Sequence, residues 1–137
     1  MTAVRALLHS HPEQISQAGA ISRCIDACFT SVETCTACAD ACLAEKHIEK
    51  LITCIRLNLD CAAVCTATGH IITRANKAGH RQLQEAQLTT CIAFCRACAA
   101  ECARHAAMHQ HCALCAEACN KCATACVDLL TSMRMPA

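Results

Sequence analysis

The sequence predicts an all-α protein, an antiparallel up-down-up-down four-helix bundle, and three observations lead to this prediction. First, 17 of the 137 residues are cysteine, and within four segments they recur at steps of three, four or seven residues. Such steps place the cysteines of a segment on one face of an α-helix, whereas a strand would need steps of two. Second, the residues between them are mostly Ala, Leu, Glu, Arg and Gln, which favour helices. Third, the connections are short, which favours antiparallel neighbours.

The chain length allows one domain, residues 1–137, with one core. We expect long helices at about 12–44, 47–74, 81–105 and 110–132, and a short extra helix before them. Residues 10–13 resemble a capping box with Pro12 in the first turn, which favours a helix start near residue 11. Residues 76–79 form the clearest loop. The junctions near 45–47 and 106–109 lack Gly and Pro and are inferred from the break in the cysteine pattern.

The cysteines occupy the inward positions where a bundle normally carries Leu and Ile, so we expect a column of thiols along its axis. They are Cys24, Cys28, Cys35, Cys38, Cys42, Cys54, Cys61, Cys65, Cys91, Cys95, Cys98, Cys102, Cys112, Cys115, Cys119, Cys122 and Cys126. Ser31 and Asn58 stand where a step of seven skips a position, and we expect both to face inward. So many small side chains, in a chain without Trp or Tyr, would leave voids, so something else should fill the volume.

A soft metal ion is the best candidate for that volume. Disulfides are disfavoured because cysteines four residues apart on one helix have nearly parallel Cβ vectors. Thiolates select Cu(I), Zn(II) or iron–sulfur clusters. Zinc prefers closed tetrahedral sites, whereas Cu(I) accepts two or three thiolates and lets each sulfur bridge neighbouring ions. A continuous column therefore favours Cu(I), with a capacity on the order of 15 to 20 ions per chain.

The two ends of the bundle differ in character. One end should collect Cys24, Cys65, Cys91 and Cys126, closed by the aliphatic residues Ile21, Ile72, Leu88 and Leu129. The opposite end should collect Cys42, Cys54, Cys102 and Cys112, with His47, His105, Met108, His109 and His111 beyond or beside them. Imidazole and thioether bind Cu(I) without losing a proton first. We therefore expect an entrance for metal there, with His105, Met108, His109 and His111 as its ligands and His47 as a weaker candidate.

Four helices with CxxxC and CxxC steps, together with a histidine cluster before the fourth helix, resemble the cytosolic branch of the copper storage proteins, from about Pro12 to Met133. The resemblance implies Cu(I) held by cysteine thiolates, entrance of metal at His105, His109 and His111, and assembly into a homotetramer. It also implies that Asn58 touches metal. A copper chaperone or a copper-requiring client is the expected partner. The first nine residues do not read as a secretory signal, so we expect a cytoplasmic protein.

Other classes of function are disfavoured by composition. A net charge of +1 argues against nucleic acid and anionic membranes as partners, and no apolar run is long enough to span a bilayer. We expect no enzyme, because no nucleophile with a positioned base is indicated. Two alternatives stay open: sequestration of soft metals in general (Zn, Cd or Ag), and a thiol redox buffer. A redox buffer would need exposed cysteines beside Lys or Arg, whereas their neighbours are mostly Ala and Thr.

Overall fold

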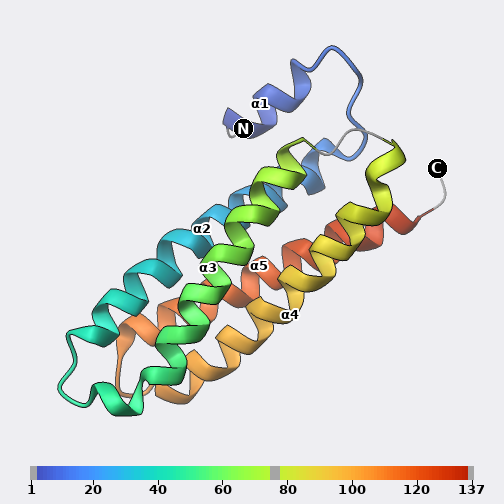
Figure 1. The fold of residues 1–137 in the computed structure, drawn as a ribbon. Coiled ribbons are helices and arrows are strands. Elements are labelled where there is room, and N and C mark those ends of the chain that lie inside the picture. Colours follow the sequence, from blue (N-terminus) through green and yellow to red (C-terminus); the bar gives the residue numbers. More distant parts are fainter. Residues whose placement is uncertain (1–2, 75–77, 136–137) are drawn as a thin grey trace.

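The computed structural model describes residues 3–74 and 78–135, which form four long helices and three short ones. The elements are α1 (Ala3–His9), α2 (Ala18–Leu43), the 3-10 turn η1 (Ile48–Lys50), α3 (Ile52–Thr73), the 3-10 turn η2 (Ala78–His80), α4 (Arg81–His105) and α5 (Gln110–Arg134). The long helices α2 to α5 lie side by side, and α1 lies at one end of them (Figure 1). Each long helix packs chiefly on two others, in the ring α2–α3–α4–α5. The predicted up-down-up-down bundle with a short N-terminal helix is therefore confirmed.

The first long helix begins at Ala18, not near residue 12 as the capping pattern suggested. The Ser10 hydroxyl donates to the carbonyl of Leu7 at 2.7 Å, so this serine ends α1 instead of starting α2. Leu8 is buried, which anchors α1 on the bundle. Gln17, just before α2, has a left-handed backbone with φ of 61°. Local hydrogen bonding and the burial of Leu8 thus override the capping pattern.

Turns were predicted on either side of α3. The first, expected near residues 45–47, lies between the end of α2 at Leu43 and the start of α3 at Ile52. It contains η1, and Leu51 follows with only 1% of its surface exposed. The predicted loop at 76–79 lies partly outside the described residues, and its described part belongs to η2.

Close packing between α2 and α3 depends on a glycine. A Cβ atom at Gly69 would lie 2.7 Å from Cζ of Phe29, well inside van der Waals contact. On the other side of α2, the hydroxyl of Ser31 donates to the carbonyl of Ala118 in α5 at 3.3 Å. These contacts bring three helices close enough for their inward cysteines to meet.

Among the described residues, no helix combines the length and the apolar character that crossing a lipid bilayer requires.

Candidate metal centre

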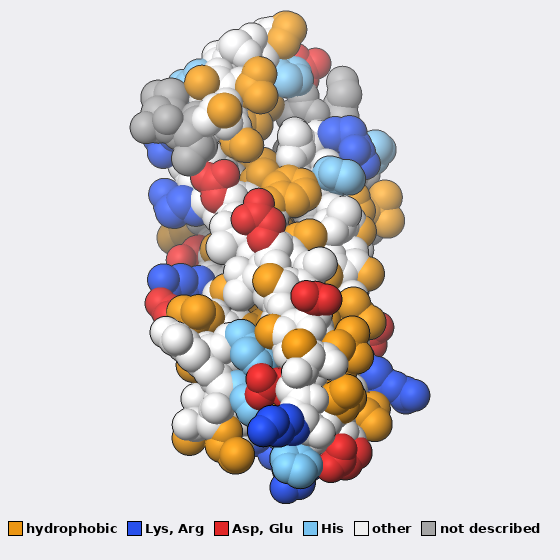
Figure 2. Space-filling view, turned by 90° about the vertical axis from the view of Figure 1, so that its left-hand side faces the viewer, with side chains coloured by type: hydrophobic (Ala, Val, Ile, Leu, Met, Phe, Trp, Pro, Cys, Tyr) orange, Lys and Arg blue, Asp and Glu red, His pale blue; other side chains and the backbone are white. Residues whose placement is uncertain are grey.

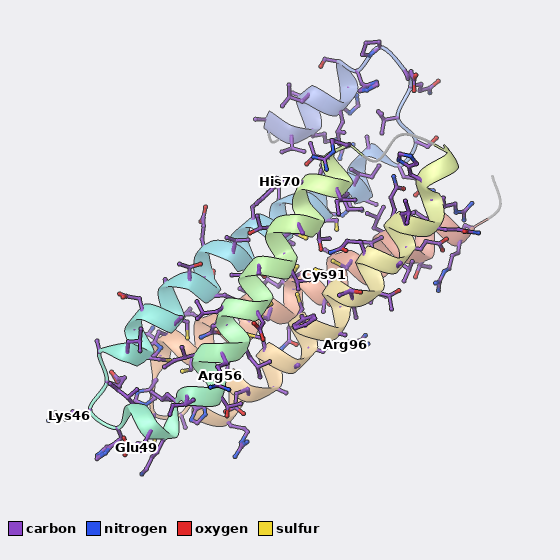
Figure 3. All side chains as sticks on the ribbon, viewed as in Figure 1. Lys46, Glu49, Arg56, His70, Cys91 and Arg96 are labelled. Atoms are coloured by element: carbon purple, nitrogen blue, oxygen red, sulfur yellow. The ribbon has the colours of Figure 1, made fainter. Side chains whose placement is uncertain are left out.

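All seventeen cysteines are free, and each is at most 1% exposed. Their Sγ atoms approach one another between helices along the whole bundle axis, and we call the set the thiol column. Sγ–Sγ distances that sample the column are 3.7 Å for Cys24–Cys126, 3.6 Å for Cys65–Cys95, 3.5 Å for Cys35–Cys119 and 3.5 Å for Cys54–Cys102. The predicted inward placement of the cysteines is confirmed. In Figure 3, Cys91 points into the space between the helices.

Groups of four sulfurs lie within 4.8 Å of one another at several levels of the column. Four such groups are Cys28/Cys91/Cys122/Cys126, Cys65/Cys91/Cys95/Cys122, Cys35/Cys98/Cys115/Cys119 and Cys38/Cys42/Cys54/Cys112. Cys91 and Cys122 each belong to two groups. Shared sulfurs suit ions that are bridged by common thiolates, and they do not suit isolated four-ligand zinc sites.

Asn58 is a polar residue inside the column, with no exposed surface. Its Oδ1 accepts hydrogen bonds from the thiols of Cys98 and Cys115, each at 3.2 Å. Its Nδ2 faces the Cys54 sulfur at 3.7 Å. Ser31 is also fully buried, so the inward placement expected for both residues is confirmed.

The close sulfurs shift one another's protonation. Hydrogen bonds from Cys126 and then Cys28 lower the pKa of Cys24 to about 5. A hydrogen bond from Cys102 is the main cause that lowers the pKa of Cys38 to about 5. Burial raises the pKa of its neighbour Cys42 to about 11. Contacts between neighbouring thiols thus favour loss of the proton at some cysteines, and burial opposes it at others.

One end of the column is closed by aliphatic side chains, as predicted. Ile72, Leu88 and Leu129 are each at most 1% exposed, and Ile21 is 6% exposed. Leu8 of α1 adds to the same core at 8% exposure. We call this the closed end.

At the opposite end, which we call the entrance end, His111 is in direct contact with thiols. Its Nδ1 lies 3.4 Å from the sulfur of Cys38 and 3.6 Å from that of Cys112. Its Nε2 is buried and has no hydrogen-bond partner. This imidazole can therefore act as a ligand at the last thiol layer.

Two other histidines predicted at the entrance end, His105 and His109, are held by carboxylates. Nδ1 of His109 lies 2.7 Å from Oε2 of Glu45, and Nε2 of His105 lies 2.7 Å from Oε2 of Glu101. The ring of His109 stacks on that of His111, with centroids 5.3 Å apart and planes inclined by 21°. Figure 2 shows histidine side chains beside acidic and basic ones toward one end of the molecule.

The side chains of Met108 and His47 face solvent instead of the thiols at the entrance end. Met108 is 83% exposed, and His47 is exposed and pairs with Glu49 at 3.4 Å on the turn that Lys46 and Glu49 mark in Figure 3. Among the described residues, neither forms a hydrogen bond with a cysteine.

The carboxylates of Glu45 and Glu101 were not predicted from the sequence. The spacing of four between Glu101 and His105 on one helix was a usable signal for that pair. The contact between Glu45 and His109 joins two different turns, and no sequence spacing indicates it.

Comparisons with known proteins agree with this site. The family model described as copper storage protein matches residues 17–131. A structure of the Streptomyces lividans copper storage protein Ccsp, loaded with 10 copper equivalents, superposes with a TM-score of 0.90 at 44% identity, over 94% of this chain and 98% of that one. The Cu(I)-bound copper storage protein BsCsp3 gives a TM-score of 0.70 at 31% identity, over 80% and 96%.

A cysteine-rich protein of Bacillus subtilis (strain 168), YhjQ, is 35% identical over 106 residues, which cover 77% of this chain and 87% of the relative. The family model spans most of the chain and includes every one of its cysteines. The chain belongs to the copper storage protein family.

Proposed function

We propose that the protein is a cytosolic store of Cu(I), which holds many ions at once through the thiolates of the thiol column. The observation that carries this function is the continuity of the column: seventeen free, buried thiols, with sulfur groups that share members. The match to the copper storage family and to copper-loaded relatives supports the same metal.

The chemistry of the column suits a monovalent ion. Each thiolate contributes one negative charge, and each Cu(I) contributes one positive charge, so a ratio near one ion per thiolate leaves the core close to neutral. A buried core tolerates such locally cancelled charge, whereas uncompensated thiolates would be costly. Zn(II) at the same ratio would leave an excess of positive charge. The expected capacity remains on the order of 15 to 20 ions per chain.

The proposed ligands are the seventeen cysteines of the thiol column. Among the histidines, His111 has the strongest support, because its ring nitrogen is within 3.4 Å of a thiol. His109 stacks on it, and His105 is the last residue of α4, four residues before His109; both stay proposed ligands of the incoming ion. Met108 stays a proposed ligand on the outer surface.

Assembly and exchange are proposed from the resemblance to the family. We propose a homotetramer of bundles, with a copper chaperone or a copper-requiring client as the partner that delivers or receives the ion. The entrance end is the place for such an exchange, because aliphatic side chains seal the closed end.

A thiol redox buffer is the weaker alternative. Oxidants react with accessible thiolates, and every cysteine here is at most 1% exposed. Sequestration of Zn, Cd or Ag is the second alternative, and a competition experiment separates it from copper storage.

In that experiment, the fully reduced protein receives equimolar Cu(I) and Zn(II) without oxygen, is desalted, and is measured by native mass spectrometry. Copper storage predicts chains that carry many copper ions and no retained zinc. Zinc retained in preference to copper would contradict it. Protein whose thiols were alkylated in denaturant serves as the control and should retain neither metal.

A further inference from the structure

At the entrance end, a contact between a carboxylate and an imidazole joins the two turns that flank the opening. Glu45 lies in the turn between α2 and α3, and His109 lies in the turn between α4 and α5. Their side chains meet at 2.7 Å with 33% and 20% of their surfaces exposed. The neighbouring pair of Glu49 and His47 is looser, at 3.4 Å, and about 70% exposed on both sides. Only the first pair is sheltered enough to hold a fixed geometry.

The contact with Glu45 decides which nitrogen of His109 is available to a metal. A carboxylate only accepts hydrogen bonds, so Nδ1 of the neutral ring carries the proton and Nε2 carries the lone pair. Within the described residues, Nε2 of His109 forms no hydrogen bond. It is not among the buried polar atoms that lack a partner, so it is accessible from outside. The lone pair is therefore open to an arriving ion.

The same contact fixes where the ring lies. His109 stacks on His111 at a centroid distance of 5.3 Å, and Nδ1 of His111 is 3.4 Å from the sulfur of Cys38. A continuous series of contacts thus leads from Glu45, through two imidazoles, to the first thiols of the column.

We propose that Glu45 is a positioning residue for the loading of Cu(I), an inference that rests on the proposed storage function. Glu45 holds His109 in one tautomer and over His111, so that Nε2 receives the ion and passes it to the thiol layer. Glu45 itself does not bind the ion. Carboxylates that hold a metal-binding imidazole typically change metal affinity or activity by about 10- to 100-fold.

The test compares Glu45→Ala with the matched variant Glu49→Ala, which removes the exposed carboxylate–imidazole pair four residues away. Cu(I) is transferred without oxygen from a weak, coloured Cu(I) complex, and the initial rate and the final number of ions are measured. We expect Glu45→Ala to load about tenfold more slowly with an unchanged final number. Glu49→Ala should load at the wild-type rate. Glu45→Gln keeps an acceptor without the charge and should fall between Glu45→Ala and wild type.

A second readout needs no metal. Nitrogen-15 NMR of the metal-free protein should show His109 with its proton on Nδ1, and this preference should be lost in Glu45→Ala but kept in Glu49→Ala. A wild-type His109 protonated on Nε2 alone would overturn the proposal. The proposal would also be overturned if Glu45→Ala loads Cu(I) at the wild-type rate while His109→Ala loads it slowly. That result would leave the storage function intact. Failure of the wild-type protein to take up Cu(I) would refute the storage function instead.

Discussion

The closed end offers the sharpest test of how the bundle is sealed. Leu88 has no exposed surface and packs in the aliphatic layer with Ile72 and Leu129. Replacing it by alanine removes three carbons from a buried site and leaves a cavity that the bundle end can only partly close. Leu-to-Ala changes of this kind cost about 3 to 5 kcal/mol, and we expect the lower value, about 3 kcal/mol, because side chains at the end of a bundle can relax into part of the cavity. For a chain of this length the loss lowers Tm by about 10 °C.

The assay is thermal unfolding of the reduced, metal-free protein, followed by circular dichroism without oxygen. Leu83→Ala is the control, because this leucine lies on the same helix but is 68% exposed. Its Tm should stay near the wild-type value. Copper capacity should be unchanged in both variants, because no thiol is removed. Equal Tm values for Leu88→Ala and Leu83→Ala would refute the assignment of a sealed aliphatic layer.

Three further predictions concern packing, access and cargo. Gly69→Ala should destabilise the protein by about 1 to 2 kcal/mol in chemical denaturation because its Cβ would meet the Phe29 ring, whereas Gly79→Ala, with nothing within 4 Å of its Cβ, should be neutral or slightly stabilising. A thiol reagent should modify few cysteines in the folded metal-free protein and all seventeen in denaturant; rapid reaction of most thiols in the folded protein would contradict their burial. Copper loading should raise Tm progressively with each equivalent added, and an unchanged Tm in calorimetry would mean that the ions lie outside the core.

Much of the fold could be predicted because cysteine spacing is a local property of each helix. Steps of three and four determine which face of each helix points inward, and short connections determine the antiparallel order. The cysteines at each end of the column could therefore be assigned from the sequence. The pairing of Cys24 with Cys126 at one end and of Cys54 with Cys102 at the other follows from these two rules.

The remaining features depend on contacts between distant residues. The start of α2 was misplaced because Ser10 caps the helix before it, a choice that depends on Leu8 finding a place in the core. The contact of Glu45 could not be predicted for a similar reason, since its partner His109 comes next to it only when the bundle is folded. The positions of residues in turns depend on tertiary contacts more than on the local sequence pattern.

The copper capacity of the single chain tests the central claim most directly. The fully reduced protein is titrated with Cu(I) without oxygen in the presence of a chromogenic Cu(I) chelator. A continuous column of seventeen thiols predicts that the protein outcompetes the chelator until well above ten ions are bound per chain, approaching about one ion per thiolate. Saturation near four ions would show isolated sites instead, and would contradict the storage column.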